Sequence, residues 1–330
     1  MATVDPAHPR DVFDLIGHEQ AEASFADALA RGRLHHAWLL CGPEGVGKAT
    51  FAYRAARRLL GAGQGAGGAL SAPAGDMVSK LVSARSHPDL FVLERMGEDG
   101  KARRVIPVDE ARKLSDFFAK SPSKAPYRVA IVDAADDMNP NAANALLKTL
   151  EEPPPRGVLL LVSHTPGVLL ATLRSRCRRL TFQSPGEEVA VAILERHGVE
   201  GADAQALARM AQGSPGRALM LARSDALALD EAARAMVSAL PRLDPTASLA
   251  LTDRFRGAEG LATFQIFFDR LADRVQSETE RRVATGEGAP WAEAWSALHR
   301  IAADTEALNL DRADALHAAL AELGRAARAA

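Results

Sequence analysis

The heptapeptide at positions 42–48 restricts the fold of this chain more than any other stretch. Its sequence is Gly42-Pro43-Glu44-Gly45-Val46-Gly47-Lys48; the apolar run before it, 37–41, predicts a buried strand, and 49–60 predicts a helix. Glycines at this spacing let backbone N–H groups curve around phosphate oxygens, and the lysine adds a positive charge. The amino end of the following helix also favours an anion. The stretch therefore predicts a phosphate-binding loop (P-loop); the alternative is a glycine-rich turn with a solvated lysine.

The first half of the chain continues this alternation of strands and helices. Further strands are predicted by apolar runs at 90–93, 128–133, 158–163 and 180–182, and helices by 108–119 and 141–152. Such alternation indicates a parallel sheet that is covered on both faces. The glycine- and alanine-rich segment 61–75 predicts a flexible insertion or linker.

Beyond Ser184 the strand pattern stops and helical patterns take over, including long amphipathic stretches at 261–283 and 311–329. The fold class that we predict is an α/β P-loop domain with a parallel sheet, then a small helical domain, then an all-α C-terminal domain. The expected boundaries are 1–183, 184–225 and 226–330.

Composition excludes several classes of protein. The chain has 330 residues with 40 Lys+Arg and 42 Asp+Glu, and 47% of its residues are hydrophobic, which is ordinary for a globular protein. The sequence contains no apolar run of membrane-spanning length, and its first ten residues do not resemble a secretory signal. The two cysteines, Cys41 and Cys177, lie far apart. We therefore expect a cytoplasmic protein without membrane contact, and the net charge of −2 still permits a local basic face.

The candidate nucleotide site lacks two parts that hydrolysis requires. Ala49 stands where a Ser or Thr hydroxyl would bind Mg²⁺, and Thr50 lies about 100° further round the helix. The strand at 128–133 ends in Asp133, near the expected metal, but Ala134 occupies the position of a catalytic glutamate. Asp136 and Asp137 are alternative bases beyond the strand end. The sequence leaves open whether the chain binds ATP without hydrolysing it. The candidate nucleotide-binding residues that it retains are Gly42, Gly45, Gly47, Lys48, Thr50 and Asp133.

Four motifs, in order along about two thirds of the chain, resemble those of the AAA+ sliding-clamp loaders of bacterial DNA polymerase III. They are the segments 34–40, 141–154 and 213–219 and the tripeptide Ser175-Arg176-Cys177. The segments 87–90 and 307–311 fit the same family. Because its nucleotide site is degenerate, the chain resembles the stationary, non-hydrolysing type of subunit rather than the motor type.

The resemblance implies an AAA+ domain, a helical lid and a C-terminal collar in a five-subunit ring. The expected partners are the motor (gamma/tau) and delta subunits, with the sliding clamp and primed DNA reached through the complex. Arg176 is expected to act as an arginine finger in trans, contacting ATP on a neighbouring subunit, within the interface motif Ser175-Arg176-Cys177. Arg217 matches the second sensor arginine of the lid. The alternative for Arg176 is a structural salt bridge, and Cys177 and His164 are interpreted as packing residues.

The resemblance also has one gap, because many relatives carry four zinc-binding cysteines in the insertion after the P-loop helix. The region 61–90 of this chain contains no cysteine, so we expect no metal site and no zinc, and no cofactor is required. We expect no intrinsic enzymatic activity, because Ala49 and Ala134 replace two catalytic residues, and any polymerase activity would belong to the holoenzyme. Two alternatives stay open: an active motor-type ATPase, and an unrelated P-loop enzyme such as a nucleotide kinase, which would leave the Ser-Arg-Cys motif unexplained.

Overall fold

A computed structural model describes residues 7–95, 105–242, 245–257, 260–284 and 286–329. Its contacts divide the chain into two compact units. The first unit comprises the chain up to Gly198 together with Ala211–Leu219, and the second comprises Val199–Met210 and the chain from Met220 onward. The expected division into three domains at 183 and 225 stays a prediction.

A five-stranded parallel sheet forms the centre of the first unit. Its strands are β1 (Ala37–Cys41), β2 (Leu90–Glu94), β3 (Arg128–Asp133), β4 (Gly157–Ser163) and β5 (Arg178–Thr181). The strand order is β2-β3-β4-β1-β5. In this register Cys41 pairs with Ser163, and Glu94 pairs with Asp133. The ends of four strands therefore meet at one carboxyl edge, where the candidate nucleotide loop begins.

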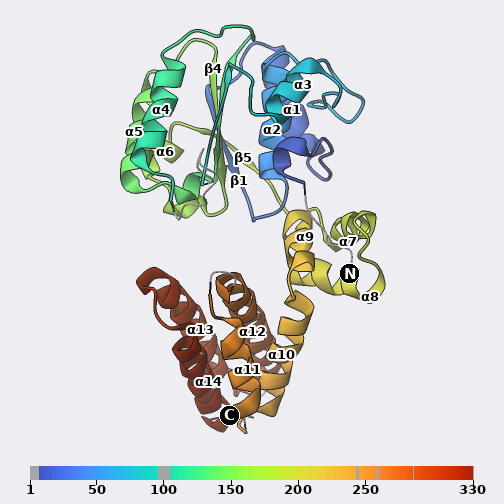
Figure 1. Ribbon diagram of the computed structural model, residues 1–330, viewed down its shortest axis with the longest axis vertical. Coiled ribbons are helices and arrows are strands. Elements are labelled where there is room, and N and C mark those ends of the chain that lie inside the picture. The colour runs from blue at the N-terminus through green and yellow to red at the C-terminus, as the bar shows by residue number, and fades with distance from the viewer. Residues whose placement is uncertain (1–6, 96–104, 243–244, 258–259, 285, 330) are drawn as a thin grey trace. The chain divides into compact units, whose positions relative to one another are not determined.

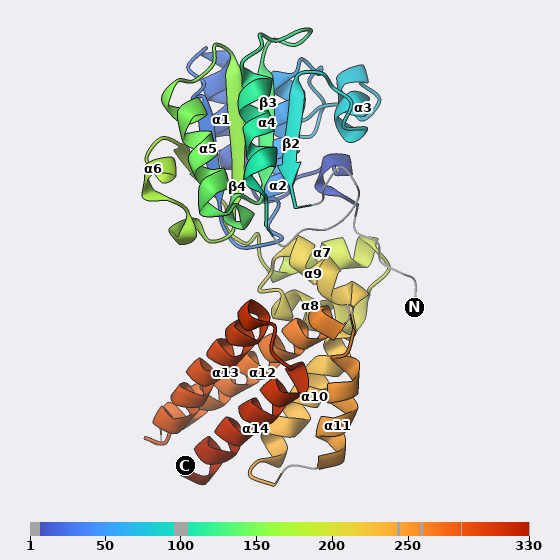
Figure 2. The ribbon, with the colours of Figure 1, turned by 60° about the vertical axis from the view of Figure 1, so that its left-hand side comes forward.

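Helices cover both faces of the sheet, as Figures 1 and 2 show. One face carries α1 (Glu19–Ala30), α2 (Lys48–Leu59) and α3 (Met77–Ser83). The other face carries α4 (Val108–Phe118), α5 (Pro140–Glu151) and α6 (Ala171–Arg174). Short 3-10 turns span Pro9–Asp11, Ala135–Asp137 and Pro166–Val168. Each face has its own apolar core, because successive side chains of a strand point to opposite faces.

The segment 61–75 is not a linker, which corrects the expectation from its composition. Leu70 is only 1% exposed and belongs to the core on the α1–α2 face, and Arg54 Nη2 of α2 donates a hydrogen bond to the Gly67 carbonyl at 2.7 Å. Ala62 and Ala72 are also buried, and the Gly63 amide donates to Asp76 Oδ2 at 3.1 Å, so buried side chains and hydrogen bonds attach this glycine-rich segment to the domain.

The remaining helices follow the sheet in sequence. They are α7 (Glu187–Arg196), α8 (Gly201–Met210), α9 (Pro215–Arg223), α10 (Ala226–Ala239), α11 (Pro245–Arg254), α12 (Gly260–Val283), α13 (Ala289–Leu308) and α14 (Arg312–Ala329). In the second unit α12 packs against α10 and α13, and α13 packs against α14. Their shared core contains Phe264, Phe267, Leu271, Trp291 and Leu316. The predicted fold class, an α/β P-loop domain with a parallel sheet followed by an all-α C-terminal part, is confirmed.

No helix among the described residues combines the length and the apolar character needed to cross a membrane.

Candidate functional site

The candidate nucleotide loop connects β1 to α2 at the carboxyl edge of the sheet. Gly47 caps α2 with a φ of +108°, a backbone conformation that residues with a Cβ rarely adopt. Gly47, the N-cap residue, has no side chain to bond the first-turn amides of α2, and backbone N–H groups at a helix start can bind an anion. The strand, the glycine-containing loop and the helix that the local sequence predicts are present, and phosphate binding by the loop stays a prediction.

Lys48 lies against its own loop. Its Nζ donates hydrogen bonds to the carbonyl oxygens of Gly42, at 2.6 Å, and Pro43, and the residue is only 3% exposed. Burial lowers the pKa of Lys48 to about 8, and the negative charges of Asp133 and Glu44 oppose that shift. A phosphate would have to draw this ammonium away from two carbonyls before the lysine could bind it.

The start of α9 lies directly on the loop. The Gly216 amide donates to the Gly45 carbonyl at 2.8 Å, and a Cβ placed on Gly45 would lie 2.2 Å from the Arg217 backbone nitrogen. Two backbones therefore touch, and the contact needs glycine at position 45. The structure brings the predicted sensor residue Arg217 next to the predicted loop.

Asp133 lies at the end of β3, beside a second carboxylate. Burial raises the pKa of Asp133 to about 6, and the negative charge of its register partner Glu94 adds to that rise, while His8 and Lys48 oppose it. Ala134, at the position of the missing base, is buried. The strand end therefore offers one carboxylate of raised pKa, with an apolar residue after it.

The two alternative bases are both engaged in other bonds. Asp136 accepts hydrogen bonds from the Ser163 hydroxyl, at 2.7 Å, and from the backbone N–H of His164. Asp137 forms an ion pair with Arg95 at 3.1 Å. Asp136 thereby binds the end of β4 and the residue after it, and each of the two carboxylates already has a partner within the chain.

Two further residues complete the description of the loop. Thr50 is buried in α2 at 9% exposure, and the sequence left its role open. His18, which the sequence analysis missed, is buried and places its Nε2 2.7 Å from the Val46 carbonyl. Its ring also meets Phe182 edge-on, with centroids 4.9 Å apart. His18 lies 28 residues before Val46 in the sequence, and no local pattern links the two. Only the structure shows their contact.

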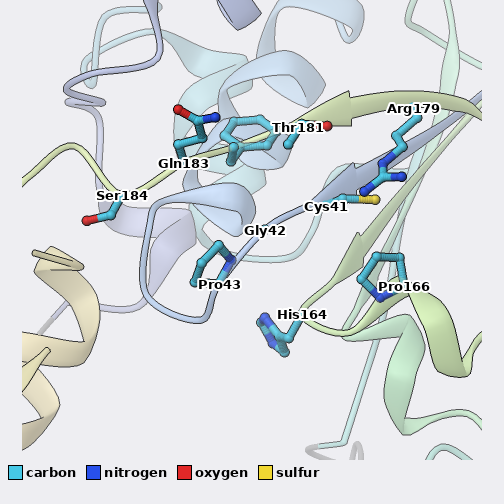
Figure 3. Close-up of a pocket in the computed structure, with 10 residues that line it drawn as sticks. Cys41, Gly42, Pro43, His164, Pro166, Arg179, Thr181, Gln183 and Ser184 are labelled. Carbon is cyan, nitrogen blue, oxygen red and sulfur yellow. The ribbon is translucent and has the colours of Figure 1, made fainter. Parts of the chain in front are cut away.

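A cavity of about 420 Å³ lies beside the start of the loop (Figure 3). Cys41, His164 and Arg179 are among its lining residues, and Figure 3 shows the Arg179 side chain extending alongside the Cys41 sulfur. Burial raises the pKa of the Cys41 thiol, and Arg179 opposes that rise. The Nδ1 atom of His164 is buried without a hydrogen-bond partner among the described residues, and burial followed by the charge of Lys48 lowers its pKa. The raised pKa of Cys41 disfavours its thiolate, which is the nucleophilic form of cysteine.

Arg176 lies in the turn between α6 and β5. Its Nη2 forms an ion pair with Glu151 Oε1 at 2.9 Å, and its Nη1 donates to the Thr172 carbonyl at 2.9 Å. The side chain remains 36% exposed. Ser175 donates its hydroxyl to the same Thr172 carbonyl at 3.1 Å. The guanidinium is thus fixed from two sides and still faces solvent.

The neighbours of Arg176 have different surroundings. Burial raises the pKa of the Cys177 thiol to about 12, which keeps it protonated, and the residue packs against the core on the α4–α5 face. The Arg178 guanidinium lies 4.8 Å from the centre of the Trp38 ring. Arg174 is exposed and makes no ion pair with any residue that the structure describes. Arg174 therefore differs from Arg176 in having no carboxylate partner.

Arg176 and the nucleotide loop lie at opposite ends of the sheet. Arg178, which begins β5, pairs with Trp38 near the amino end of β1, whereas the loop follows the carboxyl end of β1. A strand of four residues spans roughly 13 Å. The structure therefore brings Gly45, Lys48, Asp133 and Arg217 into one neighbourhood and places Arg176 at the other edge.

No group of three or more His, Cys, Asp or Glu side chains within the described ranges is arranged to hold a metal ion. The absence of zinc stays a prediction.

Comparisons with known proteins place this arrangement in a family. The profile of the family described as "DNA polymerase III, delta subunit" matches residues 17–186, slightly more than half of the chain. DNA polymerase III subunit delta' of Pseudomonas aeruginosa is 38% identical over 175 residues, which cover 53% of this chain and 51% of the relative. The delta' subunit of Escherichia coli is 35% identical over 201 residues, covering 59% and 56%.

A tau subunit is also similar, over a longer stretch. DNA polymerase III subunit tau of Salmonella typhimurium is 29% identical over 307 residues, covering 89% of this chain and 44% of the relative. The chain spans about half the length of the curated relatives it matches. The resemblance to clamp-loader subunits of the delta' type is confirmed by the family match and by the two delta' relatives. The chain therefore belongs to the family of DNA polymerase III delta subunits.

Proposed function

We propose that this chain is a delta'-type subunit of the DNA polymerase III clamp loader, which hydrolyses no ATP itself and supplies Arg176 to the ATP site of a neighbouring subunit. The similarity to two delta' subunits supports the role in the clamp loader. The observation that carries the proposal is that Arg176 precedes the amino end of β5, whereas the chain's own nucleotide loop follows the carboxyl end of the neighbouring strand β1. An exposed arginine at that edge is suited to a ligand held by another subunit.

The nucleotide loop supports the absence of hydrolysis. Ala49 offers no hydroxyl for Mg²⁺, and Ala134 offers no base. Lys48 is occupied by two carbonyls of the loop, and Asp136 by the residues after β4. The retained glycines and Lys48 are compatible with ATP binding without turnover.

The chemistry of Arg176 suits a phosphate partner. A guanidinium is planar and permanently charged, and its fork of donors matches the spacing of phosphate oxygens. An arginine supplied in trans accelerates phosphoryl transfer by about 10³–10⁵ in other enzymes. A subunit without turnover of its own can therefore control hydrolysis in its neighbour.

The proposed assembly is a ring of five subunits with gamma/tau and delta partners, which loads the sliding clamp onto primed DNA. Residues 184–225 are proposed to form the lid and 226–330 the collar through which the ring assembles. Similarity to tau and gamma subunits supports partners of this type.

The test uses the complex reconstituted from this chain and its partner subunits, with clamp and primed DNA present. Arg176→Ala is expected to leave assembly intact, as read by size-exclusion chromatography, and to lower DNA-dependent ATPase and clamp loading. Arg174→Ala removes the same charge two residues away and should leave both rates unchanged. Equal ATPase in the wild-type, Arg176→Ala and Arg174→Ala complexes would reject the finger role.

A second measurement separates this role from that of a motor. The isolated wild-type chain, with Mg²⁺ and primed DNA, is expected to hydrolyse no ATP. The Lys48→Ala variant is expected to give the same result. Turnover by the wild type that Lys48→Ala abolishes would identify an active ATPase with substitute catalytic residues.

A further inference from the structure

We propose that Glu151 is a positioning residue for Arg176: its carboxylate holds the guanidinium in the orientation that reaches the ligand of the neighbouring subunit. This inference rests on the proposed function and deepens it. The structure gives the carboxylate–guanidinium contact directly, at 2.9 Å.

The contact comes from two separate elements. Glu151 is the last residue of α5, and Arg176 follows α6, which packs against α5. The Thr172 carbonyl binds the other terminal nitrogen of the same guanidinium. Anchoring at both terminal nitrogens fixes the plane of the fork, whereas a single partner would leave it free to rotate.

The anchored arginine keeps donors for a further ligand. A guanidinium has five N–H donors, and the Glu151 and Thr172 contacts need one on each terminal nitrogen. The Nε hydrogen and one hydrogen on each terminal nitrogen remain. The side chain is 36% exposed, so the guanidinium group is not enclosed by the chain that anchors it.

The end of α5 adds to the attraction. Carbonyl groups at the carboxyl end of a helix carry partial negative charge, which favours a cation there. Glu151 and the helix end therefore act on the guanidinium in the same direction. Glu152, the next residue, is also exposed but has no ion pair with any residue that the structure describes. This adjacent glutamate provides a matched control on the same segment.

The experiment measures kcat and KM for ATP in the reconstituted complex, for Glu151→Ala, Glu151→Gln, Glu152→Ala, Arg176→Ala and the double variant Glu151→Ala/Arg176→Ala. Glu151→Ala should lower kcat by up to about fivefold, the rate equivalent of an exposed ion pair, with KM unchanged. Glu151→Gln keeps an acceptor oxygen and should recover most of the loss, while Glu152→Ala should match the wild type. In the Arg176→Ala background, Glu151→Ala should cause no further loss.

The outcomes separate this inference from the proposed function. If Arg176→Ala lowers kcat but Glu151→Ala does not, the positioning role is wrong and the finger stands. A rise in kcat for Glu151→Ala, or a loss that persists without Arg176, also overturns the positioning role. If Arg176→Ala matches the wild type, the proposed function fails and this inference fails with it.

Discussion

Burial acts in opposite directions on two ionisable side chains beside the nucleotide loop. It raises the pKa of Asp133 to about 6 and lowers that of Lys48 to about 8, because removal from water disfavours the charged form of either group. Glu94 raises the pKa of Asp133 further, since the register of β2 and β3 places the two carboxylates side by side. The shift at Asp133 has a direct consequence for stability.

The Asp133→Asn variant should become more stable relative to the wild type as pH rises from 4 to 7. In the folded chain the Asp133 carboxyl holds its proton up to about pH 6, against an ordinary value of 3.8. Folding therefore favours the protonated Asp133 carboxyl, and the stability that this gives is present at low pH and is lost as pH rises through 6. Asparagine does not ionise, so the variant has no such loss. At about 1.4 kcal/mol per pKa unit, the relative gain is at most about 3 kcal/mol. Urea unfolding at pH 4 and pH 7 measures it; an identical difference at both values would contradict the prediction.

At the scale of elements, one buried arginine joins α2 to three other parts of the first unit. Arg54 Nε donates to Glu22 Oε1 of α1 at 2.6 Å, and its terminal nitrogens reach the carbonyls of Phe13 and Gly67. Both charged side chains are almost fully buried. Removing either charge would leave the other buried without its partner.

Glu22→Ala should therefore lower the free energy of unfolding of the first unit by about 3–5 kcal/mol. The control is Asp27→Ala on the same helix, which breaks an exposed ion pair with Arg31 and should cost no more than about 1 kcal/mol. Urea unfolding at neutral pH compares the two. Similar losses for both variants would show that burial of the Arg54 pair adds nothing.

The contact between α9 and the nucleotide loop is a second element-scale feature with a test. A Cβ at Gly216 would lie 2.9 Å from the Cα and carbonyl oxygen of Gly45. Gly216→Ala should therefore push the start of α9 off the loop and accelerate solvent exchange of amides in 214–218. Gly167→Ala is the control, because a Cβ there meets nothing within 4 Å. Unchanged exchange rates in Gly216→Ala, measured by NMR, would mean that the loop absorbs the added methyl group.

Local patterns in the sequence predicted most elements, because apolar runs and helical periodicity report burial directly. The predicted strand 37–41 has the same bounds as β1. The strand β5 begins at Arg178, two residues earlier than predicted, because its first two residues are arginines and do not continue the apolar run. The helix α3 was missed, although Asp76 caps it by accepting from the Val78 amide at 2.8 Å. Contacts between distant residues, such as Glu151 with Arg176 or Gly45 with Gly216, leave no local pattern and needed the structure.

At the scale of the whole molecule, the chain has two units with separate apolar cores. Leu160 of β4 is fully buried in the first unit, and Leu271 of α12 is fully buried in the second. The residues of each core cluster come from the same unit. Each unit therefore has its own source of hydrophobic stabilisation.

Leu160→Ala and Leu271→Ala should each destabilise only the unit that contains them. A buried leucine truncated to alanine costs about 2–5 kcal/mol, because apolar contact is lost and a cavity remains. Hydrogen exchange with mass spectrometry reads the two units in one experiment, since the amides of each unit report its own opening. Leu160→Ala should accelerate exchange in β1, β3 and β4 and leave α12–α14 unchanged, and Leu271→Ala should do the reverse. If either substitution accelerated exchange equally in both units, the chain would unfold as a single cooperative body, and the cores would depend on each other despite their separate packing.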